Sequence, residues 1–204
     1  MRGVGHHEGE AMRKSLWFLV SVLMLSGLSA CTYNIQPAVP ALTPIAGSGS
    51  RLNCKAVLLM PEEFANREYI SSFEGREIRL MVGPPAAKAV EALIRSRYEQ
   101  VDKSSASGDG TLDLVRLTSN QNTNAPIVVR PRFTRLESSV RPFRYSIEFG
   151  LTLDIAGLSA PVAPSGVGIG AAGLYVQSEI QKAADDALAQ AISSLTSALP
   201  TMCQ

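Results

Sequence analysis

The chain has 204 residues, of which 19 are Lys or Arg and 18 are Asp or Glu, so its formal net charge is only +1. A protein this close to neutral lacks the long-range field that gathers nucleic acid, which argues against a nucleic-acid partner. The length suits one domain with a short extension.

Residues 12–30 carry the pattern of a secretory signal. Met12-Arg13-Lys14 makes a short cationic start, and an apolar run of about ten residues follows from Leu16 to Leu25. This run is too short to span a bilayer as a helix, which takes about 20 residues. We interpret residues 12–30 as a signal peptide. Residues 1–11 are then an extension or a mis-assigned start, because Met12 is the more natural first residue.

The signal-like segment ends in Leu28-Ser29-Ala30-Cys31, which resembles the lipobox of bacterial lipoproteins. The resemblance implies cleavage before Cys31, a diacylglyceryl group on its sulfur and an acyl chain such as palmitate on its amine. Two or more chains hold a protein stably on a membrane. In sorting like that of enterobacteria, an Asp at the next position retains a lipoprotein in the inner membrane. Residue 32 is Thr, so the resemblance implies the outer membrane, with the domain facing the periplasm. An ordinary signal peptide with a coincidental cysteine is the alternative.

Cleavage before Cys31 would limit the chemistry of the mature chain. Both histidines, His6 and His7, precede this point, so Ser-His, Cys-His and zinc-His sites would be absent. The acidic pairs at 62–63 and 185–186 are typical of solvated surface. We therefore expect no enzymatic activity and no catalytic residue, metal or cofactor.

Cys54 and Cys203 are the two cysteines left beside Cys31. In an oxidising compartment an even pair favours a disulfide, which here would join the two ends of the domain. Closing a loop of this length stabilises the fold by roughly 4–5 kcal/mol on the chain-entropy model. Two free thiols that never meet are the alternative.

The mature chain would begin with an uncharged segment rich in Pro, Gly and Ser. Residues 31–50 therefore predict a flexible tether, followed by a single domain over residues 51–204. Within residues 55–60 a continuous apolar run follows Lys55, which predicts a central strand covered on both faces. We expect a loop or short turn over residues 62–75.

The next elements are a strand-like segment and a helix. Alternation over residues 77–82 predicts a short strand or an extended lead-in. Gly83-Pro84-Pro85 opens a helix with one apolar face, which we expect to end near Gln100. A polar surface loop is predicted over residues 102–111, and a further strand over residues 112–117.

The second half of the domain predicts strands and then a helix. Residues 127–136 are strand-like, although Pro131 indicates an edge or a bulge. Residues 145–155 alternate strictly between apolar and other side chains, which is typical of a strand with one buried face. Ser178 to Gln181 reads as a capping box, and the apolar-faced helix behind it ends at Pro200.

Residues 168–173 match G-x-G-x-x-G formally. The match follows a Pro/Ala/Ser-rich loop and lacks the acidic partner about 20 residues later that a dinucleotide site requires. We therefore reject a dinucleotide site. These glycines instead predict a strand or hinge where the backbone approaches a neighbour closely.

The order of these elements predicts an α+β fold. Two apolar-faced helices flanking a run of strands must cover the same sheet face. We expect a two-layer sandwich, in which two helices lie on one face of a mixed, mainly antiparallel sheet of four or five strands.

Five arginines fall within 15 residues of the strand region, beside aromatic side chains. Guanidinium groups suit bidentate binding of phosphate or carboxylate, so the cluster is a candidate anion-binding or partner-binding edge. The alternative is the wet face of an antiparallel sheet, whose charges discourage edge pairing. The members are Arg130, Arg132, Arg135, Arg141 and Arg144.

The layout of residues 51–204 behind the lipobox of Cys31 resembles the small outer-membrane lipoproteins that assist envelope export. These include lipopolysaccharide-assembly and exopolysaccharide-export lipoproteins and the domains related to the curli exporter and the TolB N-terminal domain. The resemblance implies a membrane anchored, non-catalytic accessory protein with a protein partner in an envelope complex, some relatives forming homo-oligomeric rings. The alternative function is a periplasmic module that binds an anionic lipid or glycan through the Arg-rich edge.

Overall fold

The computed structural model describes residues 32–42, 51–73, 76–106, 126–141, 144–156, 163–173 and 176–199. Several predictions fall elsewhere in the chain. The signal peptide, Cys31, Cys203 and the strand predicted over residues 112–117 lie outside the described residues.

The described part of the chain combines strands and helices. In chain order its elements are β1 (Thr32–Ile35), β2 (Leu52–Pro61), α2 (Glu62–Ala65), β3 (Glu68–Phe73), β4 (Arg76–Met81), α3 (Gly83–Arg97), β5 (Tyr98–Ala106), β6 (Ile127–Arg141), β7 (Arg144–Ala156), β8 (Ser165–Ala172) and α5 (Gln177–Ala198).

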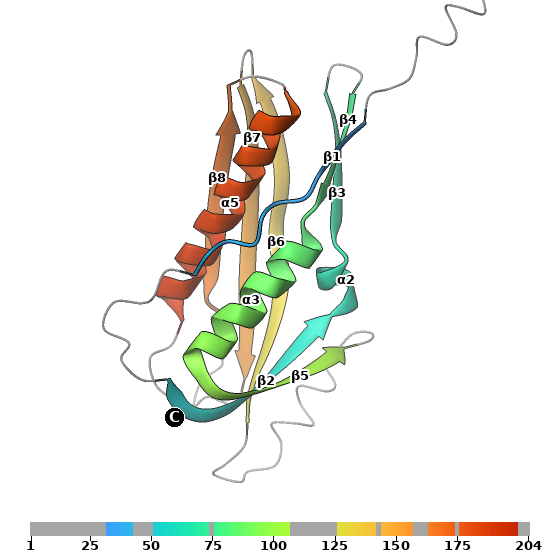
Figure 1. Cartoon of the computed structure of the whole chain (residues 1–204). Helices are drawn as coiled ribbons and strands as arrows, with labels where there is room; N and C mark the ends of the chain where they lie inside the picture. Colours follow the sequence, from blue (N-terminus) through green and yellow to red (C-terminus); the bar gives the residue numbers. More distant parts are fainter. Residues whose placement is uncertain are drawn as a thin grey trace, which may run out of the picture.

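The strands form two sheets. The larger has the order β5-β2-β6-β7-β8, with β5, β2 and β6 parallel and β6, β7 and β8 antiparallel. The smaller has the order β1-β4-β3. Figure 1 shows α3 and α5 side by side on one face of the larger sheet. The predicted α+β fold, with a mixed sheet and two helices on one face, is confirmed. The three-stranded sheet is an addition to it.

The core lies between the larger sheet and these two helices. β7 carries the alternation seen in the sequence, and its apolar side chains from Tyr145 to Ile155 are at most 2% exposed. On its other face Ser146, Glu148 and Asp154 are half-buried. Burial of one face of a central strand is what fixes its register, since a slip of one residue would expose the whole apolar set.

β8 and α5 meet through small residues. A methyl group added to Gly168 would lie 1.9 Å from the carbonyl oxygen of Ala187, and one on Gly170 would lie 1.7 Å from that of Ala183. Glycine is therefore required where the strand backbone touches the helix backbone. The close approach predicted for the G-x-G-x-x-G segment is confirmed.

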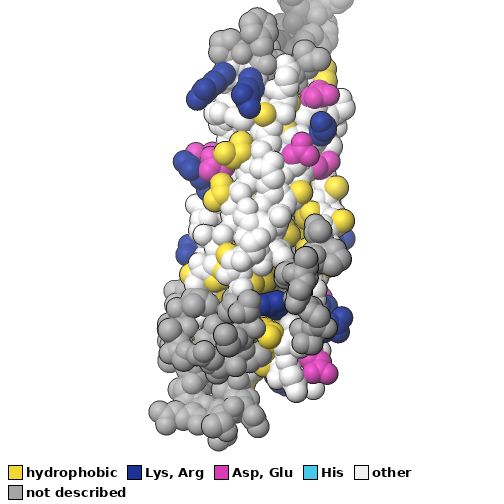
Figure 2. All heavy atoms as spheres, turned by 90° about the vertical axis from the view of Figure 1, so that its left-hand side faces the viewer, with side chains coloured by type: hydrophobic (Ala, Val, Ile, Leu, Met, Phe, Trp, Pro, Cys, Tyr) yellow, Lys and Arg dark blue, Asp and Glu magenta, His cyan; other side chains and the backbone are white. Residues whose placement is uncertain are grey.

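Side chains of α5 also cover the outer edge of β8. The Gln190 Oε1 accepts a hydrogen bond from the backbone N–H of Ile169 at 3.2 Å, and Ser194 Oγ donates to the carbonyl oxygen of Val167 at 3.4 Å. Figure 2 shows this side of the molecule, where hydrophobic side chains are scattered among charged ones. Such contacts protect an edge strand from pairing with another chain.

The segment after Cys31 is ordered where a flexible tether was predicted. β1 pairs in parallel with β4, and Ile35 is fully buried. Beyond it, Gln181 Nε2 donates to the carbonyl oxygen of Gln36 at 2.7 Å, and the N–H of Ala38 donates to Asp185 Oδ1 at 2.8 Å. We call residues 32–42 the N-terminal strap. For residues 32–42 the tether prediction is wrong, because a buried isoleucine and hydrogen bonds with α5 hold the strap, whereas residues 31 and 43–50 of the predicted tether lie outside the described residues.

Replacing Asp185 with alanine should loosen the strap. The loss of one half-buried acceptor should lower the free energy of unfolding by about 1 kcal/mol. Amide hydrogen exchange at Ala38 should accelerate more than exchange in β7. Asp186→Ala is the matched control, since Asp186 is the neighbouring exposed carboxylate of the same helix. Equal exchange at Ala38 in both variants would contradict the docking.

Two segments in the first half of the domain that are predicted as loops contain regular secondary structure. Residues 62–75 were predicted as a loop or short turn but contain α2 and β3, and Phe64 of α2 is buried. The first long helix ends at Arg97 rather than near Gln100. β5 then occupies residues 98–106, which overlaps the predicted polar loop 102–111. A polar strand is tolerated because β5 is an edge strand, where Lys55 pairs with Asp102 at 2.8 Å.

The capping box predicted at Ser178 to Gln181 is wrong. α5 begins at Gln177, after Val176, and no side chain caps its first turn. The Gln181 side chain is instead bonded to the strap and to Asp185. Gln181 therefore makes tertiary hydrogen bonds in place of the local bond that a capping box would require.

Candidate functional site

A crevice opens where β2 and β6 separate. The two strands pair only from Ala56 to Leu58 on β2 and from Ile127 to Val129 on β6. β2 ends at Pro61 and turns into α2, while β6 continues to Arg141 along β7. Pro131 has no N–H to donate to a neighbouring strand, which fits the end of the pairing. The predicted edge at Pro131 is confirmed, and a bulge follows between Phe133 and Arg135.

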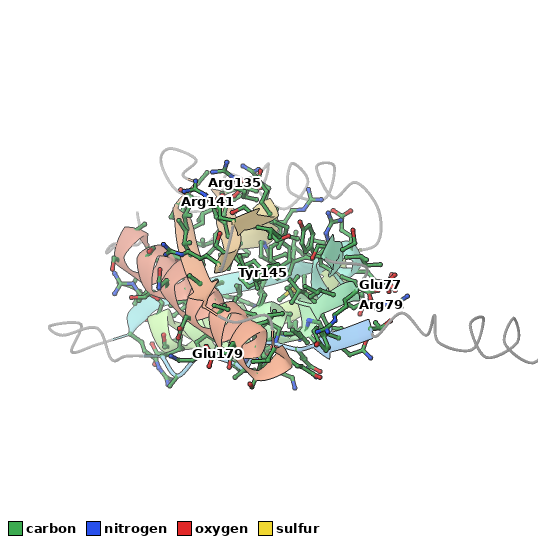
Figure 3. The ribbon with its side chains drawn as sticks, turned by 90° about the horizontal axis from the view of Figure 1, so that it is seen from above. Glu77, Arg79, Arg135, Arg141, Tyr145 and Glu179 are labelled. Carbon is green, nitrogen blue, oxygen red and sulfur yellow. The ribbon has the colours of Figure 1, made fainter. Side chains whose placement is uncertain are left out.

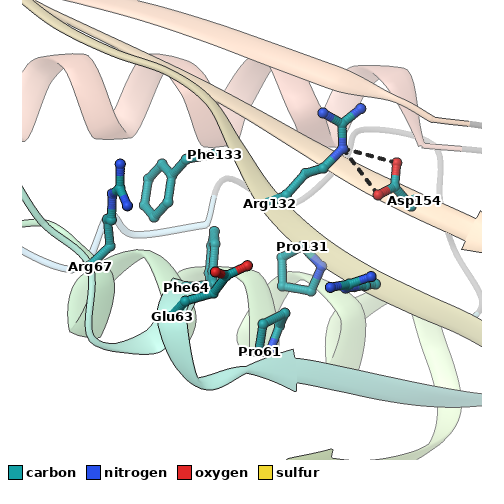
Figure 4. A pocket seen from close by; sticks show the side chains of 9 residues that line it. Pro61, Glu63, Phe64, Arg67, Pro131, Arg132, Phe133 and Asp154 are labelled. Carbon is teal, nitrogen blue, oxygen red and sulfur yellow. Dashed lines mark hydrogen bonds and ion pairs between the residues drawn. The ribbon is translucent and has the colours of Figure 1, made fainter. Parts of the chain in front are cut away.

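The crevice has a volume of about 240 Å³ and a partly apolar floor. The rings of Phe64 and Phe133 stack with centroids 4.6 Å apart, which fixes α2 against β6. Figure 4 shows Arg67 at one end, Arg132 and Asp154 at the other, and Phe64 and Pro131 between them. The lining residues are Pro61, Glu63, Phe64, Arg67, Arg130, Pro131, Arg132, Phe133 and Asp154.

The charges of the crevice are partly paired. Arg132 Nε lies 3.1 and 3.2 Å from the two carboxylate oxygens of Asp154. Within the described segments, neither Arg67 nor Arg130 has an ion-pair partner, and Glu63 has none either. Among the described residues, the crevice therefore offers two guanidinium groups without an ion pair, those of Arg67 and Arg130, and one carboxylate without an ion pair, that of Glu63. Such a set suits a ligand that carries a phosphate or carboxylate group together with hydrogen-bond donors.

The five arginines of the sequence cluster do not form one site. Arg130 and Arg132 line the crevice. Arg135 lies farther along β6, 3.2 Å from Glu137 and 2.8 Å from Glu148. Its hydrogen bond to Glu137, followed by the charges of both glutamates, raises the pKa of the guanidinium. Arg141 and Arg144 pair opposite each other at the end of the β6–β7 hairpin.

Sequence reasoning missed Arg67, Glu63 and Asp154 as lining residues. Glu63 lies in α2 and Arg67 lies just after it, in a segment predicted as a loop or short turn. Asp154 belongs to the outward face of β7. The signal that could have found Asp154 is the alternation of residues 145–155, which places it on the same face as Arg132. The pairing itself depends on the register of β6 with β7.

The structure describes some of the other site residues that the sequence predicts, but not all of them. Cys54 lies on β2 and is disulfide-bonded, while Cys203 lies outside the described residues, so their pairing stays a prediction. Glu62 and Glu63 are exposed, as expected of solvated surface. Asp186 is exposed too, but Asp185 is half-buried against the strap.

None of the helices in the described part of the chain combines the length and the hydropathy that a membrane span requires.

Two of the solved structures that resemble this chain are only weakly similar to it. No protein-family model matches the chain, and no curated protein matches significantly. A protein from Caulobacter crescentus CB15, provisionally described as a lipoprotein, is similar with 14% identity and a TM-score of 0.25, over 45% of this chain and 80% of that one. The hypothetical protein CT253 from Chlamydia trachomatis is similar with 7% identity and a TM-score of 0.32, over 71% of this chain and 98% of that one. Likenesses of this size assign no function.

Proposed function

We propose that this chain is a lipid-anchored, non-catalytic accessory lipoprotein of an envelope transport or assembly complex, held in the outer membrane with its domain in the periplasm. The observation that carries the proposal is the lipobox-like Leu28-Ser29-Ala30-Cys31 behind an apolar segment that is too short to span a bilayer. Cleavage there also removes both histidines, which leaves a chain suited to binding rather than to His-dependent catalysis.

The order of the N-terminal strap supports the same proposal. Thr32 follows Cys31 directly and already pairs with β4. A lipid on Cys31 would therefore hold the folded domain at the membrane surface, and not at the end of a long flexible linker. An accessory protein that must present one face to a membrane-embedded partner gains from such preorganisation, because less orientational freedom is lost on binding.

Cross-linking and purification from the native membrane test the partner claim. A C-terminal affinity tag on the full chain should recover a stoichiometric envelope protein after solubilisation in detergent. Residues 12–42 fused to an unrelated periplasmic domain provide the control, because this fusion keeps the signal, the anchor and the strap but lacks the α+β domain. Recovery of the same proteins by the fusion, or of no stable partner by the full chain, would contradict the accessory role.

A second candidate function is a periplasmic module for an anionic lipid or glycan. The observation that favours it is the crevice, in which Arg67 and Arg130 have no ion-pair partner among the described residues and flank an apolar floor. Sugar phosphates and uronic acids combine an anionic group with a ring that packs on such a floor.

Arg130→Gln is expected to weaken binding of glucose 6-phosphate or glucuronate at least tenfold, because a charge-assisted contact in a partly enclosed site contributes about 1.5–3 kcal/mol. Calorimetric titration measures the dissociation constant. Arg95→Gln is the control, since Arg95 is an exposed arginine of α3, 3.1 Å from Glu91 and outside the crevice. If neither ligand binds the unmodified protein, or if both variants bind alike, this second function is wrong.

A further inference from the structure

The end of the domain that begins with β1 is where the lipid of the proposed function would attach. Thr32 pairs with Glu77 at the start of β4, so no residue separates Cys31 from the three-stranded sheet. Because a residue in an extended chain spans at most about 3.6 Å, a lipid on Cys31 would lie next to this sheet. We propose that this end of the domain is a membrane-contacting surface, whose arginines bind the headgroups of anionic phospholipids. The inference rests on the proposed lipid anchor.

Two hairpins of the domain, β3–β4 and β6–β7, reach the same end. The β3–β4 hairpin closes at the pair Phe73 and Arg76, and the β6–β7 hairpin at the pair Arg141 and Arg144. Figure 1 shows the two hairpin ends and the start of β1 together at the top of the molecule.

Two side-chain contacts hold these hairpins together. Tyr69 Oη accepts a hydrogen bond from the N–H of Ser138 at 3.0 Å, and Ser71 Oγ lies 3.2 Å from Tyr145 Oη. Each contact joins β3 to the end of the β6–β7 hairpin. The surface is therefore built on two connected sheets, and it does not depend on a loop to take its shape.

The cations of this end are exposed. Arg76, Arg141 and Arg144 are all solvent-accessible. Arg76 is held beside the anchor, because its Nη1 donates to Tyr33 Oη at 2.5 Å and its guanidinium lies 5.7 Å from the centre of the Tyr33 ring. The planar guanidinium fork suits phosphate oxygens.

Among the described residues, Arg76 and Arg144 have no ion-pair partner at this end. Glu77 is ion-paired with Arg79, and Glu179 lies in the first turn of α5. Figure 3 views the molecule from this end, with Arg141, Glu77, Arg79 and Glu179 labelled. Arg76 and Arg144 therefore suit an anionic bilayer surface, to which basic residues near a membrane are attracted.

A single-tryptophan reporter tests the orientation. The chain has one tryptophan, Trp17, which lies before Cys31, so the cleaved protein would have none. Val140→Trp places a reporter at a 43% exposed position beside Arg141. Val167→Trp is the matched control, 49% exposed, because Val167 pairs with Gly150, about 17 Å along β7 from the partner of Val140.

The lipidated variants are reconstituted into vesicles of phosphatidylcholine and phosphatidylglycerol that contain a brominated lipid. Fluorescence of Val140→Trp should be quenched several-fold more than that of Val167→Trp. Mass spectrometry of the same sample shows whether Cys31 carries lipid. Equal quenching in a lipidated protein overturns the inference alone, whereas an unlipidated Cys31 in membrane-derived protein overturns the proposed function.

The role of the arginines is tested in the same vesicles. Arg76→Gln together with Arg144→Gln should reduce quenching of the Val140→Trp reporter to the level seen in vesicles of phosphatidylcholine alone. Arg95→Gln, an exposed substitution on α3, should leave quenching unchanged. If the double substitution has no effect, the arginines do not bind headgroups and that part of the inference is wrong.

Discussion

Replacing Gly168 with alanine should lower the free energy of unfolding by about 3 kcal/mol, a large fraction of what a domain of this size has. The added methyl group would lie 1.9 Å from the carbonyl oxygen of Ala187 and 2.5 Å from the backbone nitrogen of Ala191. Both atoms belong to the backbone of α5, so no side-chain rotation relieves the overlap. The helix must move away from the sheet, and contacts along the whole β8–α5 interface are then lost.

Urea unfolding followed by circular dichroism measures the loss. Gly173→Ala is the matched control, because a methyl group there would meet no atom within 4 Å. Its free energy of unfolding should stay within about 0.5 kcal/mol of the unmodified protein. A Gly168→Ala protein as stable as the control would show that β8 and α5 do not approach as closely as described.

Loss of the disulfide is the second large effect that we expect. If Cys54 is bonded to Cys203, Cys203→Ser should lower the free energy of unfolding by roughly 4–5 kcal/mol on the chain-entropy model, because the bond closes nearly the whole domain into one loop. The comparison is made in a Cys31→Ala background, which leaves only these two cysteines. Urea unfolding under non-reducing conditions gives the difference.

Reduction provides the control for this prediction. The reduced Cys31→Ala protein should unfold at the same urea concentration as the oxidised Cys203→Ser variant, since both lack the bond. Titration of the unfolded, unreduced Cys31→Ala protein should find no free thiol. Two titratable thiols, or an unchanged midpoint in Cys203→Ser, would contradict the predicted pairing.

The long elements could be predicted because their patterns are strong. Residues 145–155 alternate over their full length, and β7 spans Arg144–Ala156. The helix over Gln177–Ala198 shows apolar residues at helical spacing, and its alanines match the glycines of β8. In these segments local pattern and tertiary burial require the same structure.

The short and polar strands could not be predicted, because pairing partners create them. β5 contains Glu99, Asp102 and Lys103, which favour a loop, yet it forms the edge beside β2. β1 has one fully buried side chain, Ile35, and depends on β4 for its hydrogen bonds. Contacts between distant segments outweigh weak local preference in such strands.

The candidate site, too, could be predicted from the sequence only in part. The sequence singles out Arg130 and Arg132, but it does not show that Asp154 neutralises the second and leaves the first without an ion pair in the described structure. That difference follows from the register of β6 against β7 and from the bulge after Phe133. Arg67 joins the site only because Phe64 stacks on Phe133 and brings α2 to the crevice.

Membrane fractionation of Cys31→Ala tests the central claim, the lipid anchor, most directly. The unmodified protein should sediment with the outer membrane and stay there in high salt, since acyl chains hold it by the hydrophobic effect. The Cys31→Ala protein should appear in the soluble periplasmic fraction or as an uncleaved precursor. Unchanged attachment of a cleaved Cys31→Ala protein to the outer membrane would contradict the account.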